Sequence, residues 1–255
     1  MPTNKSGHHS PALKQIAKEI FHLDRNIPKT VWKLFSRPGH LTNASFHSPN
    51  EKWVHPFKLY LAINLIFFIL TPLLNSSNFE VFSFDVRSRI RLDEDFNKKI
   101  EKACVSDQIS KEIYIERFNA HIKYNQPALM FLIIPFWGLL LQIMYIHNRL
   151  PFSLHLTHAM HLLAFFLMLL LLAQGLFQLF KLFGLPQNIL GLLVIPLIGL
   201  CFLIYLFRSL KNVCPDKIGW TLLKSGVLFI GFFLILGVYV NFLFHYTYLA
   251  LKSGY

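Results

Sequence analysis

Three histidines in the run HLTHAMH are the residues whose type and spacing could support chemistry. His155, His158 and His161 recur at every third position, so on a helix they lie within one arc of about 120°. His147 precedes them, and a short connection would bring it to the same end of the helix. Neutral imidazole is a common ligand of zinc, iron and copper. The spacing is therefore compatible with a transition-metal site on these four histidines.

Other interpretations of the same histidines are open. Imidazole is amphipathic, so histidines at the start of a membrane helix also suit the membrane interface, where they would serve structure. A proton-linked role is a further alternative. His40, His47 and His55, in the basic segment before the first apolar run, could reach the same face. The last four apolar runs contain no Asp or Glu that could act as a general base, which disfavours enzymatic chemistry.

The composition identifies the elements that must position these residues. Of the 255 residues, 54% are hydrophobic and 15% are charged, whereas a soluble domain has about 25% charged residues. This composition excludes a soluble enzyme and a disordered chain. The three cysteines form no Cys-x-x-Cys pair, so the sequence predicts neither a zinc ribbon nor a disulfide framework. Five apolar stretches are long enough to cross a bilayer. We therefore predict an all-α polytopic membrane bundle of about five transmembrane helices, at Phe57–Leu74, Pro127–Ile146, Phe152–Phe180, Leu185–Phe207 and within Leu222–Leu251.

The distribution of charge predicts the orientation. The formal net charge is +12, and residues 1–56 are rich in Lys and Arg, whereas residues 75–126 are balanced. In a membrane protein such an excess indicates topology rather than nucleic-acid binding. We expect a cytoplasmic basic arm over residues 1–56 and a transmembrane bundle over residues 57–251. The bundle would include an external helical loop at 75–126.

Two non-membrane segments carry helical patterns. Residues 12–23 place apolar side chains on one face and Lys14 and Lys18 on the other, which is typical of a helix lying on an anionic membrane surface. The alternative is a basic flank that only fixes topology. A second helix is expected at residues 28–35, ended by Arg37-Pro38-Gly39. The spacing of apolar residues over 93–124 predicts two short amphipathic helices with a break near 104–108. We expect these two helices to cap the bundle.

Polar residues also occur inside the apolar runs. Interhelical hydrogen bonds are the commoner explanation for such residues, although a functional role is the alternative. Lys224 has no acidic partner in the runs, so we expect it to extend toward the interface. The other polar residues are Asn64, Gln142, Gln174, Gln178, Asn241 and His245.

Four blocks, taken in order, resemble a known family. They are KTVWKLFSRPGH, HPFKLYLAINLIFFI with Pro56 and Tyr60, Gln126-Pro127 followed by ALMFLIIPFWGLLLQIMYIHNR, and SLHLTHAMHLLAFF. Over residues 29–166 this arrangement resembles the bacterial membrane family called domain of unknown function 3667. The resemblance implies a multi-pass protein of the bacterial inner membrane, and it supplies no activity. Many relatives carry an N-terminal cysteine zinc ribbon, which this sequence does not contain.

Two classes of function are consistent with these features. The first is a non-enzymatic membrane component that organises lipids or partner proteins, with membrane lipids, another membrane protein or a second copy as partners. The alternative is a metal-dependent membrane enzyme that acts on a lipid-like substrate through the histidines at the cytoplasmic interface.

Overall fold

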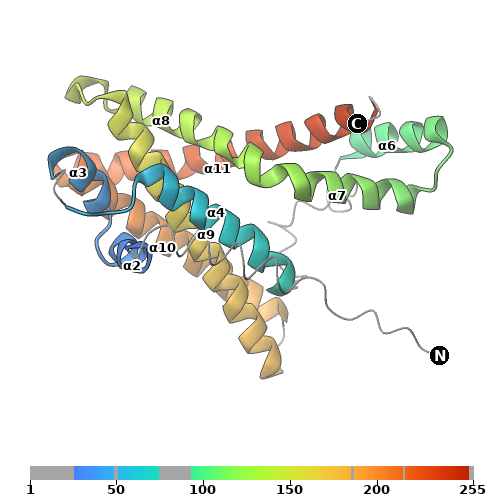
Figure 1. Cartoon of the computed structure of the whole chain (residues 1–255), viewed down its shortest axis with the longest axis horizontal. Coiled ribbons are helices and arrows are strands. Elements are labelled where there is room, and N and C mark those ends of the chain that lie inside the picture. Colours follow the sequence, from blue (N-terminus) through green and yellow to red (C-terminus); the bar gives the residue numbers. More distant parts are fainter. Residues whose placement is uncertain (1–25, 49–50, 75–92, 185–186, 215, 253–255) are drawn as a thin grey trace.

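The computed structural model describes residues 26–48, 51–74, 93–184, 187–214 and 216–252, with side chains throughout except at 187–190. Within these ranges every regular element is a helix (Figure 1). The predicted arm residues Lys14 and Lys18 lie outside the described part of the chain. The helices are α2 (Ile27–Ser36), α3 (His40–His47), α4 (Pro56–Leu74), α6 (Glu94–Asp107), α7 (Lys111–Leu129), α8 (Ile133–Met144), α9 (Phe152–Leu182), α10 (Gln187–Val213) and α11 (Ile218–Lys252), with short 3-10 turns η2 (Met130–Leu132) and η3 (Ile146–Asn148).

Five helical segments are long and apolar enough to cross a membrane. They are Pro56–Leu74, Lys111–Met144, Phe152–Leu182, Gly191–Val213 and Ile218–Lys252. This confirms the predicted all-α polytopic bundle, and the chain has the features of a multi-pass membrane protein. The segment of α9 is the most buried by its neighbours. In its apolar 18-residue stretch 56% of the residues are buried, against 33% or less in the other four segments.

The second of these segments begins earlier than the sequence predicts. The apolar run starts at Pro127, but α7 already begins at Lys111 and passes through η2 directly into α8. The missing amide of Pro127 leaves the carbonyl of residue 123, four positions earlier, without its helical donor, whereas the carbonyls next to the proline receive side-chain donors from two other helices. Asn64 of α4 donates to the Pro127 carbonyl at 2.8 Å, and the Tyr239 hydroxyl of α11 donates to the Gln126 carbonyl at 3.2 Å. These two bonds attach α4 and α11 to the segment at its proline.

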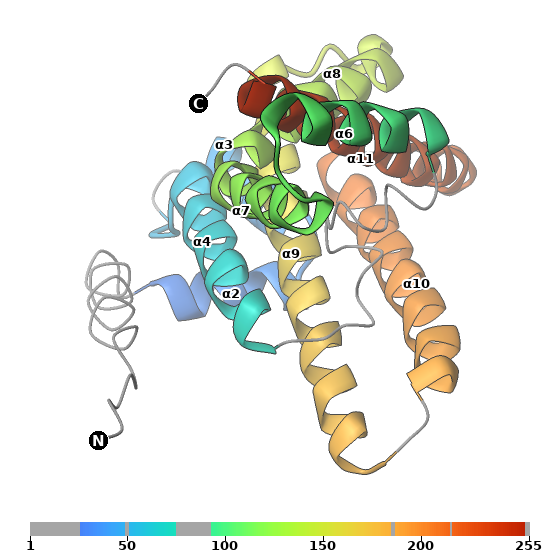
Figure 2. The same ribbon diagram turned by 90° about the vertical axis from the view of Figure 1, so that its right-hand side faces the viewer.

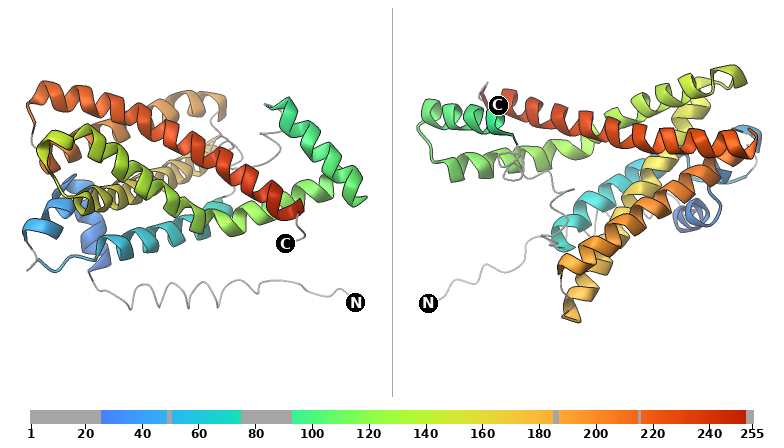
Figure 3. Two further views of the ribbon diagram at one scale, coloured as in Figure 1. Left: turned by 90° about the horizontal axis from the view of Figure 1, so that it is seen from above. Right: turned by 180° about the vertical axis from the view of Figure 1, so that it is seen from behind.

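The long helices form two groups that meet near the α8–α9 turn and diverge from it. The segment α7–α8 runs alongside α11, while α4 and α10 pack against α9 (Figures 1 and 3). Figure 2 shows the end of α9 and the start of α10 at one extremity and α6 with the end of α11 at the other. The groups are joined by a set of aromatic side chains in which Phe232 of α11 is central. Its ring centroid lies 5.5 Å from that of Trp137, 4.9 Å from that of Phe166 and 4.7 Å from that of Phe202.

Helices α6 and α7 form an antiparallel pair that covers the C-terminal part of α11 (Figure 1). The Asp93 carboxylate caps α6 by accepting from the Phe96 amide at 3.0 Å, and Gln108 ends the helix at φ 56°. The ring centroids of Phe96, Phe118 and Phe244 lie 5.8 to 5.9 Å from one another. The two helices agree with the sequence pattern, although the break between them lies at 108–110 and residues 104–107 still belong to α6. The three rings attach the pair to α11.

Candidate functional site

The three histidines of α9 all face the interior of the bundle. His155, His158 and His161 retain 0, 1 and 4% of their surface. They lie in the first turns of α9, which begins after Pro151. The face of α9 that carries these three histidines therefore points into the bundle.

Two of these imidazoles join α9 to other elements through hydroxyl groups. His161 Nδ1 lies 2.9 Å from the Thr42 hydroxyl of α3, and His158 Nε2 lies 2.9 Å from the Ser209 hydroxyl of α10. Because these partners differ, the two rings bind two separate elements to α9. This geometry is that of interhelical hydrogen bonding.

His155 and His147 have different surroundings. The His155 ring stacks on Tyr145, with 6.5 Å between ring centroids, and its two ring nitrogens have no hydrogen-bond partner among the described residues. His147 lies exposed in η3. In the described part of the chain, no group of three or more His, Cys, Asp or Glu side chains is arranged to hold a metal ion. A metal on His147, His155, His158 and His161 stays a prediction from spacing.

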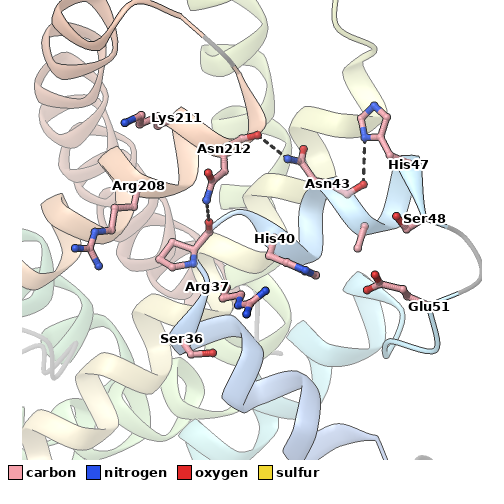
Figure 4. A pocket seen from close by; sticks show the side chains of 12 residues that line it. Ser36, Arg37, His40, Asn43, His47, Ser48, Glu51, Arg208, Lys211 and Asn212 are labelled. Atoms are coloured by element: carbon pink, nitrogen blue, oxygen red, sulfur yellow. Dashed lines mark hydrogen bonds between the residues drawn. The ribbon is translucent and has the colours of Figure 1, made fainter.

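The turn between α2 and α3 docks directly on α10. Gly39 adopts φ +80°, and a Cβ atom built on it would lie 2.7 Å from the carbonyl oxygen of Ser209. The Asn43 amide donates to the Asn212 carbonyl at 2.5 Å, and the Asn212 amide donates to the Pro38 carbonyl at 2.6 Å. Two hydrogen bonds and a glycine contact thus fix this turn against the end of α10 (Figure 4).

Apolar contacts hold α2 in the same place. The Phe35 ring lies 5.1 Å from that of Phe165 on α9, and Phe165 in turn stacks on Tyr205 of α10 with 3.5 Å between centroids. Leu34 and Leu41 are buried. The predicted helix at 28–35 is confirmed as α2, and it is an integral part of the bundle end.

A pocket of about 580 Å³ lies between this docked segment and the end of α10 (Figure 4). We call it the α3–α10 pocket. Its charged side chains are Arg37, Arg208, Lys211 and Glu51. The remaining lining residues are Ser36, Pro38, His40, Asn43, Ala44, His47, Ser48 and Asn212.

Positive charge dominates the α3–α10 pocket. Among the ion pairs between described residues, none involves Arg37, Arg208 or Lys211. All three are exposed. Partial burial, and then the charge of Lys33, lower the pKa of His40 below its usual value. The arginines and the lysine therefore supply the positive charge of the pocket.

Trp53 contacts two residues that line this pocket, His40 and Glu51, and two lysines of α2. The ammonium groups of Lys29 and Lys33 lie 5.1 and 5.6 Å from the centroid of its ring, and His40 meets the ring edge-on at 6.0 Å. The indole nitrogen donates to the Glu51 carboxylate. Cation–π contacts of this kind hold an aromatic ring beside cationic side chains.

Lys224 forms a contact that the sequence analysis missed. Its ammonium lies 2.6 Å from the Asp216 carboxylate and 4.0 Å from the centroid of the Tyr145 ring. The Asn148 amide also approaches Asp216, at 3.4 Å. The hydrogen bond from Lys224 is the main reason that the pKa of Asp216 lies below its usual value. Asp216 is the only acidic residue of the turn before α11, and that position was the available signal.

The docking residues were also missing from the sequence interpretation. Thr42, Ser209 and Asn212 are ordinary polar residues without a motif, so no sequence signal marks them. From the sequence alone, Gly39 indicates only the end of a helix. Its role in close backbone contact depends on α10, which is far away in the sequence.

Comparison with known proteins gives one match. A family model described as "Protein of unknown function (DUF3667)" matches residues 24–68, a segment that includes α2 and α3. No curated protein and no solved structure matches the chain. The segment that docks on α9 and α10 is thus the one that carries the family signal, and over residues 24–68 the chain matches the family of unknown function that its sequence resembles.

Proposed function

We propose that this multi-pass protein is a non-enzymatic membrane component that organises lipids by holding anionic headgroups at the end of the bundle. The observation that carries the proposal is the α3–α10 pocket, where Arg37, Arg208 and Lys211 have no ion pair with a described carboxylate. The proposal places this end at the cytoplasmic face of a bacterial inner membrane.

The position of the cations along α10 supports a headgroup ligand. Arg208 and Lys211 directly follow the apolar run that ends at Phe207. Cationic residues at such a place lie at headgroup depth, where each contributes about 1 kcal/mol of attraction to an anionic surface. The exposed apolar side chains of α10 and α11 would contact the acyl chains of the same lipids.

The predicted arm would add to this attraction. Lys14 and Lys18 precede α2 directly in sequence, so an arm on the membrane surface would lie on the leaflet that the pocket faces. The hydroxyl partners of His158 and His161 support a structural role for these rings. They favour the non-enzymatic class over the metal-dependent enzyme.

Lipid retention tests the proposal. The full chain is reconstituted in nanodiscs that contain equal amounts of anionic and zwitterionic phospholipid, extracted into mild detergent, and analysed for bound lipid. We expect retained lipid to be enriched in the anionic species, and enrichment to fall as salt screens the pocket. Arg208→Gln with Lys211→Gln should abolish the enrichment. Lys98→Gln with Lys102→Gln on α6 is the matched control and should keep it. Equal retention of both lipids by the unaltered protein would contradict the proposal.

A further inference from the structure

The α3–α10 pocket has two electrically different sides. Figure 4 shows Arg208 and Lys211 on one side and Glu51 on the other, with Arg37 and His40 between them. A ligand that fills the pocket therefore meets cationic donors at one end and a carboxylate acceptor at the other. A bare phosphate group would satisfy only the first of these.

Glu51 is held in place as an acceptor. The Trp53 indole donates to one of its carboxylate oxygens, and the Trp53 ring is itself covered by Lys29 and Lys33. A carboxylate can accept about four hydrogen bonds, so capacity remains for a ligand donor. His40 also faces this side of the pocket (Figure 4).

We infer that the α3–α10 pocket binds the headgroup of a phospholipid whose phosphodiester is esterified to a polyhydroxyl group, as in phosphatidylglycerol. This inference rests on the proposed function and specifies its ligand. The phosphodiester lies against Arg208, Lys211 and Arg37, and the headgroup hydroxyls donate to Glu51. The three cations and one carboxylate leave a net charge of +2, which a headgroup of net charge −1 offsets in part.

Other common headgroups fit less well. Phosphatidylethanolamine offers an ammonium donor to Glu51 but carries no net negative charge to offset the cations. Phosphatidic acid carries the charge but lacks a headgroup hydroxyl beyond the phosphate, and choline has no donor. The pocket volume of about 580 Å³ lies within the roughly 300–1,000 Å³ typical of small-molecule sites.

The test compares lipid retention by three forms of the full chain: the unaltered protein, Glu51→Gln and Glu112→Gln. Glu112 is an exposed carboxylate on α7, in the part of the bundle that carries α6, and serves as the matched control. Each form is reconstituted with equal amounts of phosphatidylglycerol, phosphatidic acid, phosphatidylethanolamine and phosphatidylcholine. Lipids retained in mild detergent are then quantified.

We expect the unaltered protein and Glu112→Gln to retain phosphatidylglycerol about five-fold more than phosphatidic acid, a ratio that corresponds to about 1 kcal/mol, the typical net contribution of one hydrogen bond. Glu51→Gln should lose this preference while still favouring anionic over zwitterionic lipid. Equal retention of phosphatidylglycerol and phosphatidic acid by the unaltered protein, or an unchanged preference in Glu51→Gln, would overturn the inference and leave the proposed function standing. Equal retention of anionic and zwitterionic lipid would overturn both.

A second arm separates a lipid from a soluble phosphate. Inorganic phosphate and glycerophosphoglycerol, which lack acyl chains, are added to the phosphatidylglycerol-loaded protein at matched ionic strength. We expect neither to displace more lipid than chloride does, because the acyl chains keep the headgroup at the membrane end of α10. Displacement by inorganic phosphate at millimolar concentration would overturn a lipid ligand. Folding of Glu51→Gln is checked by its melting temperature and elution volume. If it unfolds, Glu51→Asp, which shortens the acceptor but keeps its charge, is expected to reduce the same preference.

Discussion

The backbone of Gly39 passes so close to the carbonyl oxygen of Ser209 that a Cβ atom at position 39 would lie 2.7 Å from that oxygen. Gly39 also has φ +80°, a conformation that other residues rarely adopt. This contact seats the α2–α3 turn on α10 and so brings Arg37 and Asn43 beside Lys211 and Asn212. The α3–α10 pocket therefore depends on a glycine that lines none of it.

Replacing Gly39 by alanine is expected to destabilise the protein. The left-handed backbone alone costs about 1–3 kcal/mol, and the close contact with the Ser209 carbonyl adds to it. The measurement is thermal unfolding in detergent, followed by tryptophan fluorescence. Gly175→Ala is the control, because nothing lies within 4 Å of its Cβ position and it sits in the helix α9. If both variants melt at the same temperature, the docking contact is not as close as described.

The bond between His161 and Thr42 should contribute measurably to α3 docking. In a double-mutant cycle with Thr42→Val, His161→Leu and the double variant, we expect a coupling free energy of about 1 kcal/mol. Both groups are buried, so each single variant should also lower the melting temperature. His147→Ala is the comparison, and since this side chain is exposed its stability should change by less than about 0.5 kcal/mol. Additive single effects would show that the two side chains act independently.

The pair Asp216–Lys224 should make stability depend on acid. The hydrogen bond from Lys224 lowers the folded-state pKa of Asp216 below its ordinary 3.8, so the carboxylate stabilises the fold at higher pH. This contribution is lost as the pH falls through the ordinary value toward the lowered one. We expect the melting temperature of the unaltered protein to fall more steeply between about pH 5 and pH 3 than that of Asp216→Asn. Asp95→Asn, on α6, is the control and should follow the unaltered protein.

The local elements were predictable because their signals are local. The apolar run that starts at Phe57 anticipates α4 within one residue, and the run from Phe152 anticipates α9. The spacing of apolar residues over 93–124 likewise predicts two helices, which the structure shows as α6 and α7 on either side of Gln108. For the second segment, hydropathy identified the apolar run from Pro127 but not the start of the helix, which continues N-terminal to Pro127 through the polar sequence of α7.

The site was predictable only in part, because its geometry depends on pairs far apart in sequence. The spacing of His155, His158 and His161 predicts that they share one face of a helix, and the structure shows that this face is buried. Their partners could not be predicted, since Thr42 and Ser209 become informative only once α3 and α10 are adjacent to α9. The same holds for the α3–α10 pocket, whose cations come from two segments that no spacing rule connects.

The three phenylalanines between α6, α7 and α11 should control how firmly α6 is attached. Truncating Phe244 to alanine removes ring contacts to both Phe96 and Phe118 and leaves a gap between the helices. A buried Phe→Ala change costs about 3–5 kcal/mol when a cavity remains. We expect faster tryptic cleavage at Lys98, Lys99 and Lys102 of α6, measured by mass spectrometry of the fragments. Phe242→Ala, an exposed neighbour on α11, should leave the cleavage rate unchanged.

The predicted orientation can be tested with two exposed positions in elements that the topology assigns to opposite sides of the membrane. Burial raises the pKa of the native Cys104 thiol, so this thiol should react slowly with maleimides. Val105 beside it is 80% exposed on α6, and Trp32 is 72% exposed on α2, so both positions suit an introduced cysteine. In a chain with its three cysteines replaced, Val105→Cys should react with a membrane-impermeant maleimide in intact spheroplasts, because positive charge is retained in the cytoplasm and α6 lies beyond the first span. Trp32→Cys should react only after the membrane is permeabilised. Labelling of Trp32→Cys but not of Val105→Cys in intact spheroplasts would invert the orientation, and labelling of both would show that α2 and α6 lie on the same side.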